Sequence, residues 1–512
     1  MKLRSLPLFI FILLQVTAFA QPLDTEMIRR IKEEGTTRSG LDWIARQLTD
    51  VNGPRLTNSP GYRRALQWVE STTRSWGLSN PHAEPWGVFG PGWSLERCYV
   101  AMRAPYYHTL IAVPLAWSMG TPGEIKASVV VLDGDDSTAV PKAATSIKGK
   151  VVLMSDMDTS VRMPFKPAAR RLTDSALVNT GDTFMESPED MKSFVRYISN
   201  RQKQLAQLKA AGAAAVIFNG HYEDGTMEAE GYDYKKGQQS PVPQLSVSKE
   251  DFLRIRRLVN GGVNVELELD VRTRLVTSDL TASNVIAEIP GTDPSLKSEV
   301  VMLGGHLDSW HGGTGATDNA AGSIAALEAI RILKTLGVKP RRTIRLILWG
   351  GEEQGLLGSY YYTKKHFGDP ATMKLLPEQA KVSAYYNIDN GTGKVRGIYL
   401  QNNDAAATVF KEWFAAIGDS TAQTAAHANT GSTDHFALDA VGIPAFQFIQ
   451  DPLEYLNRTH HTNMDVYDHL SIPDLQQAAT MMAIFVYNTA QRDQQIPRKP
   501  LPPAGVWIFE GF

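Results

Sequence analysis

From Asn284 onward, short apolar runs rich in β-branched residues alternate with stretches of helical period. The run 343–349 is apolar apart from Thr343 and Arg345, which is typical of a strand buried on both faces. This alternation predicts an α/β fold with a mixed, mostly parallel sheet sandwiched by helices. We expect strands at 284–289, 300–304, 343–349, 382–388 and 443–448, and helices at 319–336, 356–366, 405–417 and 472–489.

The chain before Asn284 has a different texture. Helical patterns at 25–34, at 41–49 and after Ser59-Pro60 come first, and Ser59 and Pro60 suit a helix start. Residues 121–273 mix short strand-like runs with a long polar helix at 190–211, and we found no cluster of candidate ligands there. We therefore expect an inserted α/β module. The predicted divisions are 1–20 (signal peptide), 21–120 (N-terminal part of the main domain), 121–273 (insertion), 274–492 (main domain) and 493–512 (proline-rich tail).

The first residues indicate where the protein acts. Lys2 and Arg4 precede the apolar run 6–14, and Ala18-Phe19-Ala20 forms a small-residue cleavage site. This pattern is typical of a secretory signal peptide, and the run is shorter than the ~20 apolar residues of a membrane-spanning helix. We expect cleavage after Ala20, no stable membrane span, and a secreted or periplasmic protein.

Charge and cysteine content narrow the function classes. The 52 Lys and Arg residues nearly balance the 54 Asp and Glu residues, so nothing in the net charge of −2 favours nucleic acid as a partner. Cys98 is the only cysteine, which excludes an intrachain disulfide and a cysteine-based zinc site.

Acidic residues and histidines follow the predicted strands where each strand ends. Each of them alone has an ordinary structural explanation: Asp318, for example, would serve as a helix cap. In an open α/β sheet, however, the carboxyl ends of the strands meet at one crevice. Carboxylates and imidazoles gathered there would repel one another and lose solvation unless cations held them together. The residues concerned are His306, Asp308, Asp318, Glu352, Glu353, Asp389, His460, His461 and Asp465.

Two divalent ions would resolve that conflict. Nitrogen and oxygen ligands without a thiolate favour zinc, and leave cobalt or manganese open.

The segments that contain these residues resemble the M28 family of co-catalytic dizinc exopeptidases in order, spacing and structural context. They are Gly305–Trp310, Thr317–Gly322, Glu352–Gly355, Asn387–Asp389 and His461–Asp465. The resemblance implies the zinc-exopeptidase fold, and within the family the run 304–355 is most similar to the carboxypeptidase Q group. The stretches "IKGKVVLM" and "LKAAGAAAVIFNG" are similar to a protease-associated (PA) domain, which several members carry as an insertion.

The family pattern also implies a role for each residue. Asp318 would bridge two zinc ions, with His306 and Asp389 completing one ion and Glu353 and His461 the other. Two metals would hold a water molecule and lower its pKa towards ~7. Glu352 would be the general base that takes a proton from this water to give the metal-bridged hydroxide.

The supporting roles follow from the same pattern. Asp308 would hold the ring of His306, and Asp465 would do the same for His461. His460 is the rival of His461 as ligand; we prefer His461 because the family places its ligand directly before Thr or Ser. Ser432, Asp434 and His435 resemble the family's substrate loop, although Thr433 is inserted before Asp434.

The leading hypothesis is a secreted dizinc exopeptidase that hydrolyses dipeptides or short peptides, as a dipeptidase or carboxypeptidase. The alternative is an M28 aminopeptidase that releases N-terminal residues. A glutaminyl cyclase-like single-zinc transferase and a non-catalytic receptor-like module are remoter, because both sets of ligands and Glu352 are intact. The resemblance leaves a homodimer open.

Overall fold

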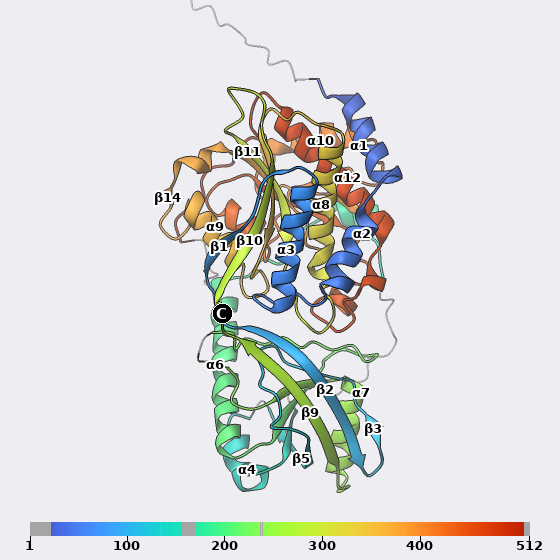
Figure 1. The fold of residues 1–512 in the computed structure, drawn as a ribbon, viewed down its shortest axis with the longest axis vertical. Coiled ribbons are helices and arrows are strands. Elements are labelled where there is room, and N and C mark those ends of the chain that lie inside the picture. Colours follow the sequence, from blue (N-terminus) through green and yellow to red (C-terminus); the bar gives the residue numbers. More distant parts are fainter. Residues whose placement is uncertain (1–21, 135, 156–168, 236, 238, 506–512) are drawn as a thin grey trace, which may run out of the picture.

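The computed structural model describes residues 22–505 except 135, 156–168, 236 and 238, so the predicted signal peptide and the last part of the tail lie outside it. The described residues form two eight-stranded sheets, one above the other in Figure 1, and a two-stranded ribbon. None of the helices in the described ranges combines the length and apolar character needed to cross a membrane.

The first sheet has the order β1-β10-β12-β11-β15-β18-β16-β17. Its central strands β12, β11, β15 and β18 are parallel, whereas β10 and β16 run antiparallel to their neighbours β12 and β18. The mixed, mostly parallel sheet predicted from the sequence is confirmed. The strands are β1 (Ser79–Val88), β10 (Thr281–Ile289), β11 (Val300–His306), β12 (Thr343–Trp349), β15 (Val382–Asn387), β16 (Val395–Tyr399), β17 (Thr424–Ala426) and β18 (Ala445–Gln450).

Helices cover both faces of this sheet because each central strand presents apolar side chains to both faces. In β11, Val301 and Leu303 pack with one group of helices, and Val300 and Met302 pack with the other. The first group is α1 (Thr25–Thr37), α2 (Leu41–Arg46), α3 (Pro60–Ser75), α8 (Ala321–Thr335), α10 (Ala407–Ile417) and α12 (Ile472–Gln491), and the second is α9 (Leu357–His366) and α11 (His435–Asp439). We call this part the first-sheet domain.

Short elements connect these layers and extend their ends. They are η1 (Gln47–Val51), η2 (Ala316–Ala320), η3 (Pro377–Lys381), η4 (Asp404–Ala406), η5 (Tyr455–Thr459) and η6 (Tyr467–His469), with the ribbon strands β13 (Gly368–Asp369) and β14 (Lys374–Leu375).

The second sheet, with the order β3-β2-β9-β5-β6-β7-β8-β4, belongs to the inserted domain, by which we mean residues 92–276. Its strands are β2 (Gly92–Ala104), β3 (His108–Thr109), β4 (Ala112–Pro114), β5 (Ile125–Asp133), β6 (Val151–Ser155), β7 (Ala215–Asn219), β8 (Gln244–Val247) and β9 (Glu266–Val276). Helix α7 (Lys249–Asn260) packs on one face, and α4 (Ala139–Ile147) and α6 (Pro188–Ala210) pack on the other. The short helix α5 (Asp174–Val178) precedes α6.

The second sheet begins earlier than the boundary at 121 that we expected. Strand β2 pairs with β9 along nearly its whole length, from Gly92 opposite Val276 to Ala104 opposite Glu266. The pairing joins residues far apart in the chain, so no local pattern marks where the sheet starts.

The two domains meet through an aromatic cluster and through a crossing segment. Trp86, Phe89 and Trp310 of the first-sheet side pack with Trp117 and Tyr234 of the inserted domain. Between β6 and α6 the chain crosses back over the first-sheet domain, where backbone bridges join Arg170 to Leu453 and Thr183 to Thr430. As a result, parts of the inserted domain lie beside the carboxyl edge of the first sheet.

Candidate metal centre

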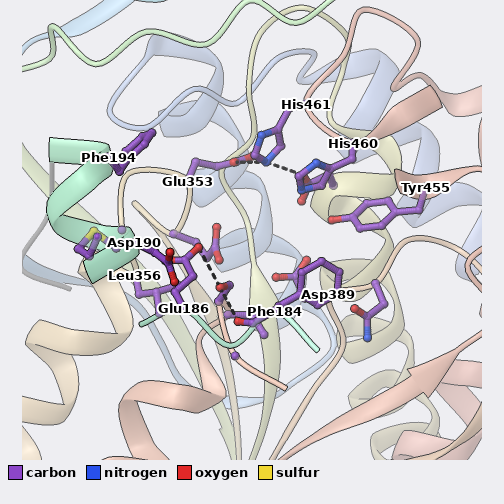
Figure 2. Close-up of a pocket in the computed structure, with 18 of the residues that line it drawn as sticks. Phe184, Glu186, Asp190, Phe194, Glu353, Leu356, Asp389, Tyr455, His460 and His461 are labelled. Carbon is purple, nitrogen blue, oxygen red and sulfur yellow. Dashed lines mark hydrogen bonds and ion pairs between the residues drawn. The ribbon is translucent and has the colours of Figure 1, made fainter. Parts of the chain in front are cut away.

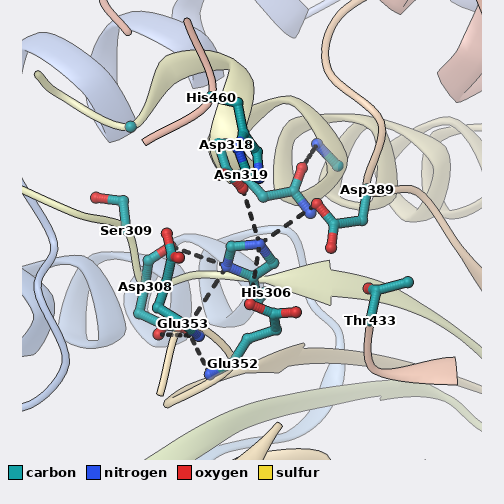
Figure 3. Close-up of polar contacts among 12 residues, drawn as sticks. His306, Asp308, Ser309, Asp318, Asn319, Glu352, Glu353, Asp389, Thr433 and His460 are labelled. Carbon is teal, nitrogen blue, oxygen red and sulfur yellow. Dashed lines mark hydrogen bonds and ion pairs between the residues drawn. The ribbon is translucent and has the colours of Figure 1, made fainter. Parts of the chain in front are cut away.

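The five predicted metal ligands, which come from five separate segments, converge at the carboxyl edge of the first sheet (Figures 2 and 3). His306 ends β11, Glu353 follows β12, and Asp389 follows β15. Asp318 lies in η2 just before α8, and His461 follows η5. The parallel arrangement of β11, β12 and β15 places their carboxyl ends side by side, as the sequence predicts.

Asp318 lies between the two imidazole rings and presents one carboxylate oxygen to each. Its Oδ1 is 3.2 Å from His306 Nε2, and its Oδ2 is 3.2 Å from His461 Nε2. His306 Nε2 is also 3.4 Å from Asp389 Oδ1, and His461 Nε2 is 3.1 Å from Glu353 Oε2. The result is two groups of donor atoms that share Asp318.

Several of these atoms have unused bonding capacity. His306 Nε2, Asp318 Oδ2, Glu353 Oε2 and Asp389 Oδ1 are buried and make no hydrogen bond. Buried polar atoms are normally satisfied, so an unpaired set that converges on one point calls for an explanation. Imidazole nitrogens and carboxylate oxygens in this arrangement fit divalent cations.

The electrostatics of the cluster lead to the same conclusion. Burial and the neighbouring Asp318 raise the pKa of Glu353 to about 8, and burial raises the pKa of Glu352 well above its usual range. Burial alone would also raise the pKa of Asp318, but its contacts with His306 and His461 hold it well below the usual range. Carboxyl groups crowded in this way ionise together only when positive charge is close by.

His460 is the weaker rival of His461. Its Nε2 lies 3.7 Å from Asp318 Oδ2, and its ring stacks on His461 with ring centroids 3.7 Å apart. His461 is closer to Asp318 and also reaches Glu353. The distances therefore favour His461 over His460.

Asp308 supports the site in two ways. The ring of His306 donates its Nδ1 hydrogen to the backbone carbonyl of Asp308 at 3.0 Å, while the Asp308 carboxylate is 3.6 Å from the same nitrogen. That carboxylate instead accepts hydrogen bonds from the Thr57 hydroxyl at 2.8 Å and from the amides of Glu352 and Glu353 at 3.4 and 3.3 Å. Asp308 thus orients the His306 ring through its carbonyl and the Glu352-Glu353 turn through its side chain.

The prediction that Asp465 holds the ring of His461 is wrong. The Asp465 carboxylate accepts hydrogen bonds from the Thr317 amide at 2.6 Å, the Thr317 hydroxyl at 2.7 Å and the Asp318 amide at 3.0 Å. It therefore fixes the backbone that carries Asp318. His461 Nδ1 instead lies 2.5 Å from Oε1 of Glu230, a residue of the inserted domain that we had not singled out.

The predicted substrate residues separate into two groups. Ser432 lines a pocket of about 460 Å³ beside the candidate metal ligands, and its hydroxyl donates to the Phe184 carbonyl at 2.9 Å. Asp434 and His435 are fully buried at the start of α11, and neither lines this pocket. Their role as substrate-binding residues therefore stays a prediction.

The inserted domain supplies one wall of this pocket, which we had not foreseen. Phe184, Glu186, Met191, Phe194 and Tyr232 line it together with Glu352, Asp389 and Tyr455 of the first-sheet domain (Figure 2). The helical period around 190–211 predicts α6 but not its position over the site. A wall made by a separate domain leaves no signal in the local pattern.

Known proteins resemble the chain in sequence and in fold. Residues 284–486 match the model of peptidase family M28. Carboxypeptidase Q of Bos taurus is 26% identical over 452 residues, which cover 88% of this chain and 85% of that protein. The crystal structure of a peptidase M28 precursor from Shewanella amazonensis is 25% identical, has a TM-score of 0.66, and matches over 94% of this chain and 99% of that one.

A more distant solved structure has the same fold. The zinc aminopeptidase BSAP from Bacillus subtilis has a TM-score of 0.55 at 21% identity and matches over 88% of this chain and 95% of that one. These matches show that residues 284–486 form a peptidase domain of family M28 and that the chain is a metallo-exopeptidase.

Proposed function

We propose that the protein hydrolyses dipeptides or short peptides as an exopeptidase with two zinc ions per chain. The observation that carries this proposal is the pair of donor groups sharing Asp318, whose two oxygens each lie 3.2 Å from a different imidazole. His306 and Asp389 would hold one ion, and Glu353 and His461 would hold the other. Cobalt or manganese would suit the same nitrogen and oxygen donors.

A pair of zinc ions in such a site lowers the pKa of water and polarises the scissile carbonyl. The remaining steps belong to residues of this chain. The Glu352 carboxylate lies 3.8 Å from His306 Nε2 at the pocket wall, close enough to the cluster to meet an attacking water. It would take the proton of that water and return it to the leaving amine, as general acid–base catalysis requires.

The pocket supports a peptide with a large apolar side chain as substrate. Phe184, Met191, Phe194 and Leu356 provide apolar surface beside the metal ligands. The volume of about 460 Å³ would hold a dipeptide-sized ligand.

The charges of the pocket favour the aminopeptidase alternative as a second candidate. Glu186 and Asp190 line the pocket, and none of its described lining residues is a lysine or an arginine. Carboxylates attract a free substrate ammonium, whereas a free substrate carboxylate calls for a cation. A dipeptide would be a substrate for both candidates, since its one peptide bond lies between a residue with a free amino group and a residue with a free carboxyl group.

The remoter alternatives have less support. A single-zinc transferase needs only one group of donors, and a receptor-like module needs none, whereas both groups and Glu352 are in place here. We also propose that the signal-like segment 1–20 directs the mature protein to the periplasm or the exterior.

A combined metal and substrate assay tests the proposal. Purified protein is analysed for metal and then assayed on a dipeptide panel in which the amino group is acetylated or the carboxyl group is amidated. We expect about two zinc ions per chain, loss of activity on chelation and recovery with zinc. Dependence on the free amino group would support an aminopeptidase, and dependence on the free carboxyl group a carboxypeptidase. Fully loaded protein that cleaves none of the peptides would contradict the proposed activity.

A further inference from the structure

Glu230 of the inserted domain contacts the outer side of the His461 ring. Its Oε1 is 2.5 Å from His461 Nδ1, and its other carboxylate oxygen accepts a hydrogen bond from the Tyr232 hydroxyl. The side chains of both Glu230 and His461 are mostly buried, at 23% and 22% exposed. The two residues are 231 positions apart in the chain.

This contact decides which nitrogen of His461 faces the cluster. A neutral imidazole carries its hydrogen on one nitrogen and a lone pair on the other, and the hydrogen-bond partner selects the arrangement. Glu230 accepts the hydrogen from Nδ1, so the lone pair of Nε2 points toward Asp318 and Glu353, 3.2 and 3.1 Å away. That orientation is the one a metal ligand needs.

The segment that carries Glu230 is tied to the loop that carries His461. The Met227 amide donates to Asn463 Oδ1 at 2.8 Å, and the Asn463 amide donates back to the Met227 carbonyl at 3.0 Å. Asn463 Nδ2 also donates to the Gly225 carbonyl at 3.1 Å, and a backbone bridge joins Glu228 to Thr462. Glu230 is therefore placed by several backbone contacts and not only by its own side chain.

His461 needs such support. Its φ of 61° lies in the left-handed region, which a residue other than glycine adopts only when its surroundings hold it there. The contacts from residues 225–230 provide that restraint on one side of the loop.

We infer that Glu230 is a positioning residue for His461, so that the inserted domain completes one half of the metal site. The inference rests on the proposed two-metal function. Tyr232 assists by holding the second oxygen of the Glu230 carboxylate. The other half of the site, at His306, takes no such residue from the inserted domain among the described contacts.

The experiment measures zinc release from full-length mature protein loaded with two zinc ions. A chromophoric chelator follows the release from wild type, Glu230→Ala, Glu230→Gln and Tyr232→Phe. The matched control is Glu223→Gln, which removes a carboxylate of the same domain that pairs with Lys249 at 3.0 Å. Thermal unfolding of each metal-free protein reports separately on folding.

We expect Glu230→Ala to release one of its two zinc ions about 10- to 100-fold faster than wild type, the range typical of residues that support a metal ligand. Glu230→Gln keeps an acceptor but loses the charge, so its effect should be smaller, and Tyr232→Phe should be smaller again. The second zinc ion, the control variant and the unfolding temperature of the metal-free proteins should be unchanged.

Unchanged zinc release in Glu230→Ala would overturn the inference. Equal weakening of both ions together with a lower unfolding temperature of the metal-free protein would also overturn it, because that result indicates a general structural role. The proposed function fails in a different way: wild type would hold two zinc ions and cleave no peptide, while the release rates would still decide the role of Glu230.

Discussion

The two histidines of the proposed metal site would have the same task, but different parts of the molecule contact them. His306 ends a central strand, is 1% exposed, and donates its Nδ1 hydrogen to a carbonyl only two residues further along. His461 lies in a loop, is 22% exposed, and depends on Glu230 of the inserted domain. One half of the site is therefore built locally, and the other half requires two domains to dock.

This difference suggests why the inserted domain and the peptidase chemistry occur in one chain. The inserted domain provides a wall of the pocket and, by our inference, the support for one metal ligand. Loosening the contact between the domains should thus affect the His461 half before the His306 half.

The largest expected effect concerns Glu352, the proposed general base. Glu352→Gln removes the carboxylate that would accept the proton but leaves every candidate metal ligand in place. We expect turnover to fall by about 10²- to 10⁴-fold, the usual contribution of a general base, with zinc content unchanged. Steady-state kinetics and metal analysis of the same preparation check this. Turnover within a few-fold of wild type would remove Glu352 from the mechanism.

Acid should weaken the contact between the domains through His311. The ring of His311 is buried against Trp93 and donates to the Pro114 carbonyl of the inserted domain at 2.8 Å. Burial lowers the pKa of His311 to about 4 from its usual 6.5. As the pH falls, the unfolded chain therefore binds a proton at His311 before the folded chain does. The free energy of unfolding decreases as a result between pH 6.5 and 4.

The full loss would be on the order of 3 kcal/mol, since each pKa unit corresponds to about 1.4 kcal/mol. His311→Gln keeps a donor for the Pro114 carbonyl but cannot titrate. Urea unfolding at several pH values should show a steeper loss of stability between pH 6.5 and 4 for wild type than for this variant. Parallel curves would show that His311 does not make the contact sensitive to acid.

The variant Asp308→Asn tests the half of the proposed site that contains His306. In Asp308→Asn the backbone carbonyl still accepts from His306, but an amide hydrogen now faces the donors Thr57, Glu352 or Glu353. We expect kcat/KM to fall by about 10- to 100-fold, as for other residues that orient a metal site, with the zinc at His306 retained. Thr57→Val, which removes only the hydroxyl, should have a smaller effect. Loss of that zinc ion in Asp308→Asn would mean that the carboxylate, and not the carbonyl, supports His306.

The smallest effect is expected at an exposed contact between the domains. Arg171 pairs with Asp451 and Asp474 at 2.8 Å each, but its side chain is 52% exposed. Asp451 also pairs with Arg396 at 2.7 Å, a contact that the loss of Arg171 leaves in place. Arg171→Ala should cost less than about 1 kcal/mol of unfolding free energy, and 0.5 M salt should reduce the difference further. A larger, salt-insensitive loss in urea unfolding would show that this contact matters as much as the buried ones.

Most of the first-sheet domain could be predicted because its strands and helices have strong local periods. The run 343–349 forms β12 with the expected bounds, and 472–489 lies within α12. The inserted domain was harder to delimit, since β2 belongs to it only through its pairing with β9. The role expected of Asp465 failed for a related reason: its side chain accepts hydrogen bonds from Thr317 and Asp318, partners that sequence position does not reveal.

The sequence by itself determined the alternation of strands and helices and the positions of His306, Asp318, Glu353, Asp389 and His461 near the ends of elements. Those positions were enough to predict that acidic residues and histidines gather at one crevice, because the carboxyl ends of parallel strands share one edge of a sheet. The resemblance to family M28 then singled out these five. Only the tertiary structure decided that Glu230 contacts His461 and that Phe184 and Phe194 line the pocket. Contacts between separate domains depend on how two finished surfaces fit together, and that fit leaves no periodic pattern in either segment.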